Sequence, residues 1–122
     1  MNRQEIYNTV AKHLLTQGVA SRIERGPGTI PACMYRGPNG TKCAVGCLIS
    51  DDEYKPELEY HTLEMLWRDF PQLSAFQNVD ENDITFLANL QTIHDVYTPD
   101  TWKMLLEKFA MDHGLVPYVH SI

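Results

Sequence analysis

The sequence lacks several features that would assign a protein to a class at once. It has no run approaching the roughly 18 consecutive apolar residues of a membrane-spanning helix, so we expect no membrane partner. It has no internal repeat and no low-complexity segment, which argues against a repeat protein or a disordered chain. Its first residues carry charges where a secretory signal has an apolar stretch, and we therefore expect a cytoplasmic location.

Cysteine is scarce and lacks the spacing of a metal-binding motif. The three cysteines are Cys33, Cys43 and Cys47, so a Cys-x2-Cys pair is missing. The sequence therefore predicts no metal site, although three thiols and one histidine would satisfy a tetrahedral zinc ion. A reducing cytosol favours free thiols, with a Cys33–Cys43 disulfide as the alternative. No motif predicts a cofactor.

Basic residues are also few, and the charge is unevenly placed. The net charge is −6, and residues 50–100 carry twelve acidic side chains against two basic ones. Residues 1–49 carry six basic and two acidic side chains. This balance argues against binding to duplex nucleic acid, because that affinity comes largely from cationic contacts with phosphates. An acidic protein can instead occupy a basic groove on another protein, as an inhibitor does.

What the sequence does contain indicates one folded domain. A chain of 122 residues with 43% hydrophobic residues is long enough to bury a core, and we assign residues 1–122 to a single domain. Apolar periodicity and capping residues predict helices over 3–17 and about 62–70, a long helix after Asp80, and a last helix from Pro99. The predicted fold class is α+β: a helix-rich domain with one β-hairpin packed by about five helices.

The predicted hairpin organises the rest of the chain. Its arms are the β-prone runs 32–36 and 41–49, and the intervening segment 37–40 contains an Asn-Gly pair that suits a tight turn. The second arm is ambiguous, and we expect its strand to end near Cys43 and a short helix to follow. Gly46 would allow another backbone to approach closely.

Cysteine and histidine supply the candidate catalytic residues. Cys43 at a helix N-terminus is the candidate nucleophile, with His94 as its base and His61 as a second possible base. Adjacent helical residues point about 100° apart, so we expect Asp95 to be poorly placed to orient His94. The alternative is that these thiols pack as small hydrophobic side chains.

Two groups of residues are candidates for binding. Tyr35 and Arg36 offer an aromatic ring and a guanidinium group for stacking on a base or a peptide, with two further tyrosines (Tyr54 and Tyr60) beyond the hairpin. The acidic run Asp51, Asp52 and Glu53 is a candidate contact for a basic partner.

A nucleotide-ligand binder is a further alternative. It would use the basic side chains of Arg22, Arg25, Arg36 and Lys42. The loop that holds two of these arginines contains glycine but lacks the Lys-Ser/Thr ending of a phosphate-binding loop.

Two stretches carry a resemblance to a known group of proteins. They are Cys33-Met-Tyr-Arg with Gly40-Thr-Lys-Cys-Ala-Val-Gly-Cys-Leu-Ile, and Leu90-Gln-Thr-Ile-His-Asp. In these the chain resembles small uncharacterised proteins encoded by tailed phages and prophages. The resemblance implies a role in host takeover or anti-defence, located in the host cytoplasm, and assigns no catalytic residue.

These observations favour a small acidic interaction protein over an enzyme. We expect it to bind and modulate a host protein, because the chain is compact, its middle segment is acidic and no complete catalytic set is present. The alternatives are a cysteine-nucleophile hydrolase or amide-transforming enzyme that uses Cys43 and His94, and the nucleotide-ligand binder. The oligomeric state is left open.

Overall fold

The computed structural model describes residues 2–23 and 32–119, and helices dominate this part of the chain. The first helix, α1 (Arg3–Gln17), begins where the sequence predicts it. The side chain of Asn2 accepts a hydrogen bond from the Glu5 N–H, and the Glu5 carboxylate accepts one from the Asn2 N–H. This reciprocal pair satisfies N–H groups that the first helical turn leaves free. At the other end Gly18 adopts the left-handed conformation that ends many helices.

Three further α-helices follow in the order predicted from the sequence. They are α2 (Leu63–Asp69), α3 (Glu81–Val96) and α4 (Pro99–Asp112). Asp80 and Asp83 form a second reciprocal cap at the start of α3. Pro99 opens α4 as expected, and Thr98 occupies the N-cap position before it without a capping hydrogen bond from its side chain.

Short elements connect the helices. Two two-residue strands, β1 (Arg22–Ile23) and β2 (Ala32–Cys33), pair antiparallel, with Arg22 opposite Cys33. The other described elements are single 3₁₀ turns, η1 (Pro38–Gly40), η2 (Gly46–Leu48), η3 (Pro56–Leu58) and η4 (Ser74–Phe76). A helix-rich architecture is therefore confirmed, with four α-helices in the described residues where we expected about five in the whole chain.

The predicted hairpin is not confirmed as such. The turn has the expected form, because Asn39 and Gly40 both have positive φ angles. Its arms, however, meet only at one antiparallel bridge between Arg36 and Lys42, beside a hydrogen bond from the Gly37 N–H to the Thr41 carbonyl oxygen. Strand β2 pairs with β1 instead of with the second arm.

The backbone groups of both arms are occupied by side chains from elsewhere. The carboxylate of Glu59 accepts hydrogen bonds from the Tyr35 and Arg36 N–H groups, each at 3.0 Å. The side-chain amide of Gln17 accepts from the Lys42 N–H at 2.8 Å and donates to the Lys42 carbonyl oxygen at 2.9 Å. Glu59 thus takes the Tyr35 N–H that a longer hairpin would use, whereas Gln17 covers the outer edge of the second arm at Lys42. The second arm then turns into η2.

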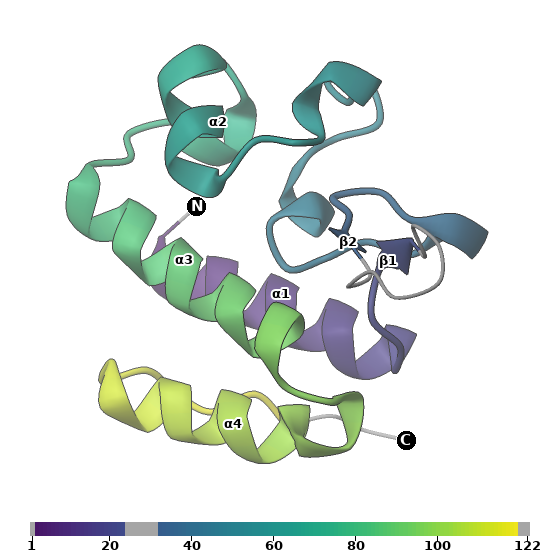
Figure 1. Cartoon of the computed structure of the whole chain (residues 1–122). Coiled ribbons are helices and arrows are strands. Elements are labelled where there is room, and N and C mark those ends of the chain that lie inside the picture. Colours follow the sequence, from purple (N-terminus) through teal and green to yellow (C-terminus); the bar gives the residue numbers. More distant parts are fainter. Residues whose placement is uncertain (1, 24–31, 120–122) are drawn as a thin grey trace.

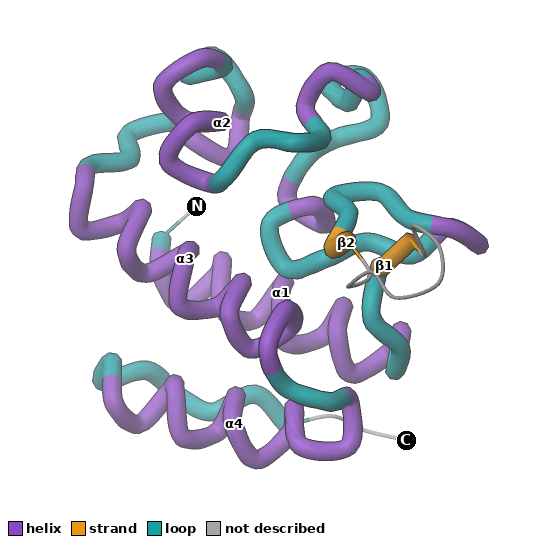
Figure 2. The backbone as a smooth tube through the Cα atoms, viewed as in Figure 1, coloured by secondary structure: helices purple, strands orange, loops and turns teal. Residues whose placement is uncertain are grey.

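The helices surround one hydrophobic core. Helix α3 crosses the centre of the molecule, with α1 behind it and α4 alongside, and α2 lies above the start of α3 (Figures 1 and 2). The largest side chains in the core are Tyr7, Phe86 and Trp102. The Tyr7 hydroxyl donates to the Leu106 carbonyl oxygen and accepts from the Tyr118 N–H, so the segment after α4 returns to α1. No helix among residues 2–23 and 32–119 is long and apolar enough to cross a membrane.

Candidate functional site

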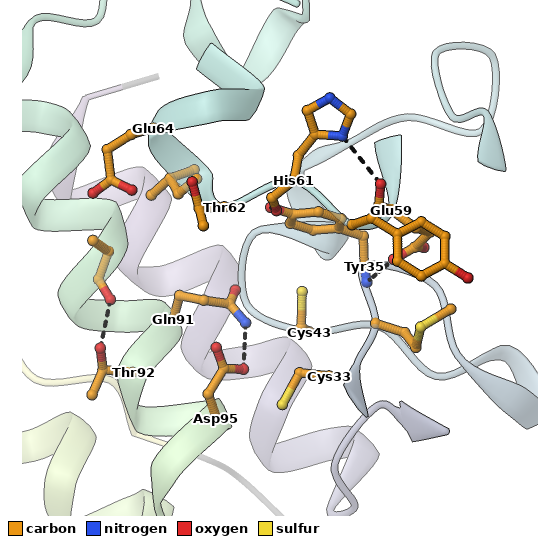
Figure 3. Close-up of a pocket in the computed structure, with 14 residues that line it drawn as sticks. Cys33, Tyr35, Cys43, Glu59, His61, Thr62, Glu64, Gln91, Thr92 and Asp95 are labelled. Atoms are coloured by element: carbon orange, nitrogen blue, oxygen red, sulfur yellow. Dashed lines mark hydrogen bonds between the residues drawn. The ribbon is translucent and has the colours of Figure 1, made fainter. Parts of the chain in front are cut away.

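A cleft with a volume of about 320 Å³ lies between α3, the start of α2 and the loops around Tyr35 and Glu59 (Figure 3). Such a volume is in the range of small-ligand sites. The cleft unites segments far apart in the sequence, among them both stretches that carry the phage resemblance. Its lining is Cys33, Met34, Tyr35, Cys43, Glu59, Tyr60, His61, Thr62, Leu63, Glu64, Ala88, Gln91, Thr92 and Asp95.

Asp95 is the centre of a hydrogen-bonded network on the α3 side of the cleft. Its Oδ1 accepts from Gln91 Nε2 at 2.7 Å and lies 2.8 Å from His94 Nδ1. Gln91 is held in turn by its Oε1, which accepts from the Val45 N–H at 2.8 Å. Our expectation that Asp95 is poorly placed to orient His94 is therefore wrong: Nδ1 lies close to its own backbone, so the carboxylate of the next residue reaches it.

His94 is fully buried and both ring nitrogens are engaged. Its Nε2 accepts a hydrogen bond from the Ser21 backbone N–H at 2.8 Å, and the ring stacks on Trp102. An amide N–H can only donate, so Nε2 presents its lone pair and Nδ1 carries the proton that is donated to Asp95. Neither nitrogen is left to accept a proton from a thiol.

Cys43 is packed into the floor of the cleft and is 1% exposed. Its Sγ accepts a hydrogen bond from the Gly46 N–H at 3.3 Å, and Cys43 lies two residues before Val45, the N-cap of η2, in line with its expected place before a short helix. Burial raises the pKa of the Cys43 thiol, which opposes formation of the nucleophilic thiolate. The structure thus places Cys43 and His94 in the same region but does not join them as a nucleophile and base.

Cys33, and not Cys43, is the thiol beside His94 and Asp95. The ligand atoms of these three residues lie within 4.8 Å of one another. Burial and the Asp95 carboxylate raise the pKa of the Cys33 thiol. A metal ion does not fit this group, because a metal-bound imidazole needs a lone pair on one nitrogen and a proton on the other, and the Ser21 N–H already faces Nε2.

His61, the second candidate base, borders the cleft on the opposite side. Its Nδ1 lies 3.1 Å from the Glu59 carbonyl oxygen, and its Nε2 lies 3.6 Å from Asp69 Oδ2. The ring also packs edge-on against Phe70. These contacts fix the loop between Glu59 and α2 and do not bring His61 to a thiol.

The predicted binding residues are split between two places. Tyr35 lines the cleft, and its hydroxyl donates to the His61 carbonyl oxygen. Arg36 points to the outside of the cleft, where it pairs with Asp51 at 2.8 Å and lies over the Tyr54 ring. Tyr35 and Arg36 therefore do not form one stacking surface.

The acidic run also has divided roles. Asp51 is occupied by Arg36, whereas the Glu53 carboxylate accepts hydrogen bonds from the Ser74 N–H and hydroxyl group at 2.8 and 2.6 Å. Asp52 is exposed and makes no hydrogen bond or ion pair within residues 2–23 and 32–119. Asp51 and Asp52 are both exposed, and Asp52 is the one of the three acids that has no partner within the described residues.

Of the basic residues considered for a nucleotide, Arg36 and Lys42 lie together beside Asp51, whereas Arg22 lies apart from them. The Arg22 guanidinium donates to the backbone carbonyl oxygens of His94 and Asp95, and Arg36 is occupied as above. Lys42 lies 4.0 Å from Asp51. Arg25 lies outside the described residues.

Three cleft residues with a charged or amide side chain were not identified as site residues from the sequence: Glu59, Glu64 and Gln91. Tyr60 was considered there as an aromatic ring for stacking. Glu59 is 4% exposed and accepts from the Tyr54 hydroxyl as well as from two backbone N–H groups. A single acid in a loop between apolar residues gives no periodic signal of this role. Gln91 and Glu64 look like solvent-facing helix positions in the sequence, and only the tertiary fold turns them towards the cleft.

Comparisons with known proteins identify no relative. No protein-family model, curated protein or solved structure matches the chain. The resemblance to small proteins of tailed phages therefore stays a prediction, and the residues of the cleft alone indicate a function.

Proposed function

We propose that this chain is a non-enzymatic interaction protein that binds a basic partner protein and takes a cationic side chain of that partner into the cleft. One observation carries the proposal. Among the described residues, the cleft is lined by three carboxylates, those of Glu59, Glu64 and Asp95, and by no lysine or arginine. A concave site of one charge sign with low-dielectric walls attracts the opposite charge.

The three carboxylates differ in how free they are to meet a ligand. Glu59 is buried and used by the protein itself. Glu64 is exposed, and in the described part of the chain no hydrogen bond or ion pair engages its carboxylate. Asp95 is half-buried behind it, with Arg22 bound to the backbone carbonyl at 2.7 Å. Glu64 is therefore the acid best placed for the first contact with a cation.

The mixed lining favours a long basic side chain over a compact ion. Leu63, Ala88 and Met34 offer apolar surface beside the carboxylates. Lysine and arginine carry an aliphatic stem that packs on apolar surface while the charged end meets a polar group.

The partner is a host protein, and the chain belongs to a phage-type system that blocks or redirects that partner. This part of the proposal rests on the resemblance. It gains support from the fact that both resembling stretches line the cleft, through Cys33, Tyr35 and Cys43 on one side and Gln91 and Asp95 on the other.

Affinity capture with matched charge variants tests the proposal. The immobilised chain is exposed to bacterial lysate, and captured proteins are quantified for wild type, Glu64→Gln and Asp52→Asn. Glu64→Gln removes a charge from the cleft, and Asp52→Asn removes one from the exposed acidic run. We expect Glu64→Gln to lower capture of a basic protein severalfold, whereas Asp52→Asn matches wild type.

Two results would overturn the proposal. Equal capture by wild type and Glu64→Gln would exclude the cleft as the contact. If only Asp52→Asn abolishes capture, the partner contacts the acidic run around residues 51–53 and not the cleft. Circular dichroism of each variant verifies that the fold is retained.

A further inference from the structure

Tyr60 stands at the mouth of the cleft with its ring in solvent. It is 92% exposed, the highest value among the large hydrophobic residues that the structure describes. It lies between Glu59, which is buried, and His61, and all three line the cleft. Because the fold does not bury this ring, its face is free to contact a ligand in the cleft.

The backbone of Tyr60 is also held in an unfavourable conformation. Its φ angle is 67°, in the left-handed region. The other non-glycine residues with positive φ in the described chain are Asn39 and Asn78, and asparagine is the residue type that tolerates this region best after glycine. Tyrosine has no such local advantage, and strain of this kind gathers where a residue is held for binding.

Contacts on either side keep Tyr60 in this position. The Glu59 carboxylate is held by three donors, and the His61 ring bonds to the Glu59 carbonyl oxygen across Tyr60 (Figure 3). The ring is therefore presented from a fixed loop. Tyrosine is among the residue types that dominate binding energy at interfaces.

The molecule already pairs a guanidinium with an aromatic ring and a carboxylate in two places. Arg36 lies 4.7 Å from the centre of the Tyr54 ring while it pairs with Asp51. Arg3 lies 5.1 Å from the centre of the Phe86 ring while it pairs with Asp83. Tyr60 with the acidic cleft has the same two components, a ring and carboxylates, and no guanidinium of the described residues lies over its ring.

We infer that Tyr60 is a specificity-determining residue whose ring stacks on an arginine side chain of the partner while the carboxylates of the cleft neutralise its charge. The inference rests on the proposed function and names arginine as the cation. A planar guanidinium can stack on a ring and bond a carboxylate in the same pose, whereas an ammonium group is a compact, strongly hydrated charge.

A titration of the full chain with short peptides tests this. The probes are three blocked tripeptides, Gly-Xaa-Gly, with arginine, lysine or citrulline at the centre, followed by NMR chemical shifts. The variants are Tyr60→Phe, which keeps the ring, and Tyr60→Gly, which removes it and also relieves the positive φ. Tyr97→Ala, an exposed tyrosine outside the cleft, is the matched control.

We expect the arginine peptide to bind wild type, Tyr60→Phe and Tyr97→Ala alike, and Tyr60→Gly about fivefold more weakly. Tyr60→Gly should lower the affinity for the lysine peptide by a smaller factor, and the uncharged citrulline peptide should not bind. Thermal unfolding should show that Tyr60→Gly is at least as stable as wild type, so its lost affinity cannot come from misfolding.

The outcomes separate this inference from the function on which it rests. The proposed role of Tyr60 is wrong if wild type and Tyr60→Gly bind the arginine peptide equally. It is also wrong if Tyr60→Gly weakens binding of the lysine peptide as much as binding of the arginine peptide. Neither result would contradict the proposed function of the acidic cleft. If wild type binds neither cationic peptide, the proposed function fails and this inference with it.

Discussion

At the scale of single residues, the environment of a side chain and not its type decides its chemistry here. Cys43 and His94 are the residue types of a nucleophile and a base. The fold nevertheless buries the thiol against Gly46 and engages the imidazole with Ser21 and Asp95. Both side chains are therefore packed in the interior of the protein and hydrogen-bonded there.

The different exposure of the thiols predicts how fast each one is alkylated. At pH 7 we expect iodoacetamide to modify exposed Cys33 slowly and Cys43 only after unfolding, because burial raises the pKa of both thiols and also excludes the reagent from Cys43. The rate at Cys33 should rise as the pH is increased, since more of the thiol ionises. Peptide mass spectrometry with and without urea measures each site.

Half-buried Cys47 is the internal control for this experiment, because burial raises its pKa to about 12. Rapid modification of Cys43 in the folded protein, ahead of Cys33 and Cys47, would contradict the packing role. It would restore the alternative of an enzyme with Cys43 as nucleophile.

At the scale of elements, Gly46 allows two segments to approach more closely than any other residue would permit. A Cβ atom at this position would overlap the Tyr35 carbonyl oxygen. We expect Gly46→Ala to destabilise the fold by about 3 kcal/mol, because backbone atoms cannot move aside cheaply. The free energy of unfolding in urea measures this cost.

Gly40→Ala is the matched control for Gly46. Gly40 has a φ of 74° and open space around the position of a Cβ atom, so the change should cost only about 1 kcal/mol through the left-handed backbone. Equal costs for the two variants would show that the approach of Tyr35 to Gly46 is not a constraint.

The contact between Glu53 and η4 should make stability depend on pH. Hydrogen bonds from Ser74 lower the pKa of Glu53 below its usual value of 4.5. A lowered pKa in the folded state contributes stability that is fully present above the unfolded value and is lost as the pH falls through the folded value. We expect urea midpoints to drop as the pH falls from about 5 towards 3.

Glu53→Gln should lower stability at neutral pH and flatten this dependence, because an amide N–H₂ would face the donors of Ser74. Asp52→Asn, one residue away and without such contacts, should keep the wild-type profile. An unchanged profile for Glu53→Gln would assign the acid sensitivity to other carboxylates.

The helices were predictable because their signals are local. The reciprocal caps at Asn2 and Asp80 lie within one turn of the helices they begin, and Pro99 opens α4 by its own geometry. The hairpin was predicted only as far as its turn. Glu59 takes the Tyr35 N–H and the second arm turns into η2, and no periodicity in the sequence reports a hydrogen bond from a distant side chain.

At the scale of the whole molecule, the charge distribution should govern how fast a partner arrives. With a net charge of −6 and acids concentrated in residues 50–100, association with a basic partner should slow as salt is added, by about tenfold between low and physiological ionic strength. Stopped-flow or surface-based kinetics across a salt series measures the association rate.

The two charge variants should separate in the same kinetic experiment. Asp52→Asn should reduce the association rate slightly and leave dissociation unchanged, because its charge is in solvent. Glu64→Gln should mainly speed dissociation, because it removes a contact inside the cleft. Rates that do not depend on salt would contradict electrostatic attraction of the partner.

The candidate site was less predictable than the fold, because it is assembled from segments that lie far apart in the sequence. The sequence identified Tyr35, Cys43 and His94 by residue type, but it gave no sign that Glu59 and Glu64 meet Asp95 across one cleft. Those acids come from separate loops and helices, and only the packing of α2 near α3 brings them together. The expectation of an acidic binding protein stays a prediction, which the capture experiment tests.

The side-chain amide of Gln17 has one more consequence, for the behaviour of the protein in crowded solution. By bonding both the N–H and the carbonyl of Lys42, it fills the place that an adjoining strand would otherwise take. A second molecule finds no open edge at this point on which to add a strand. The β-prone middle of the chain is thus protected against self-templated association by a residue that lies far from it in the sequence.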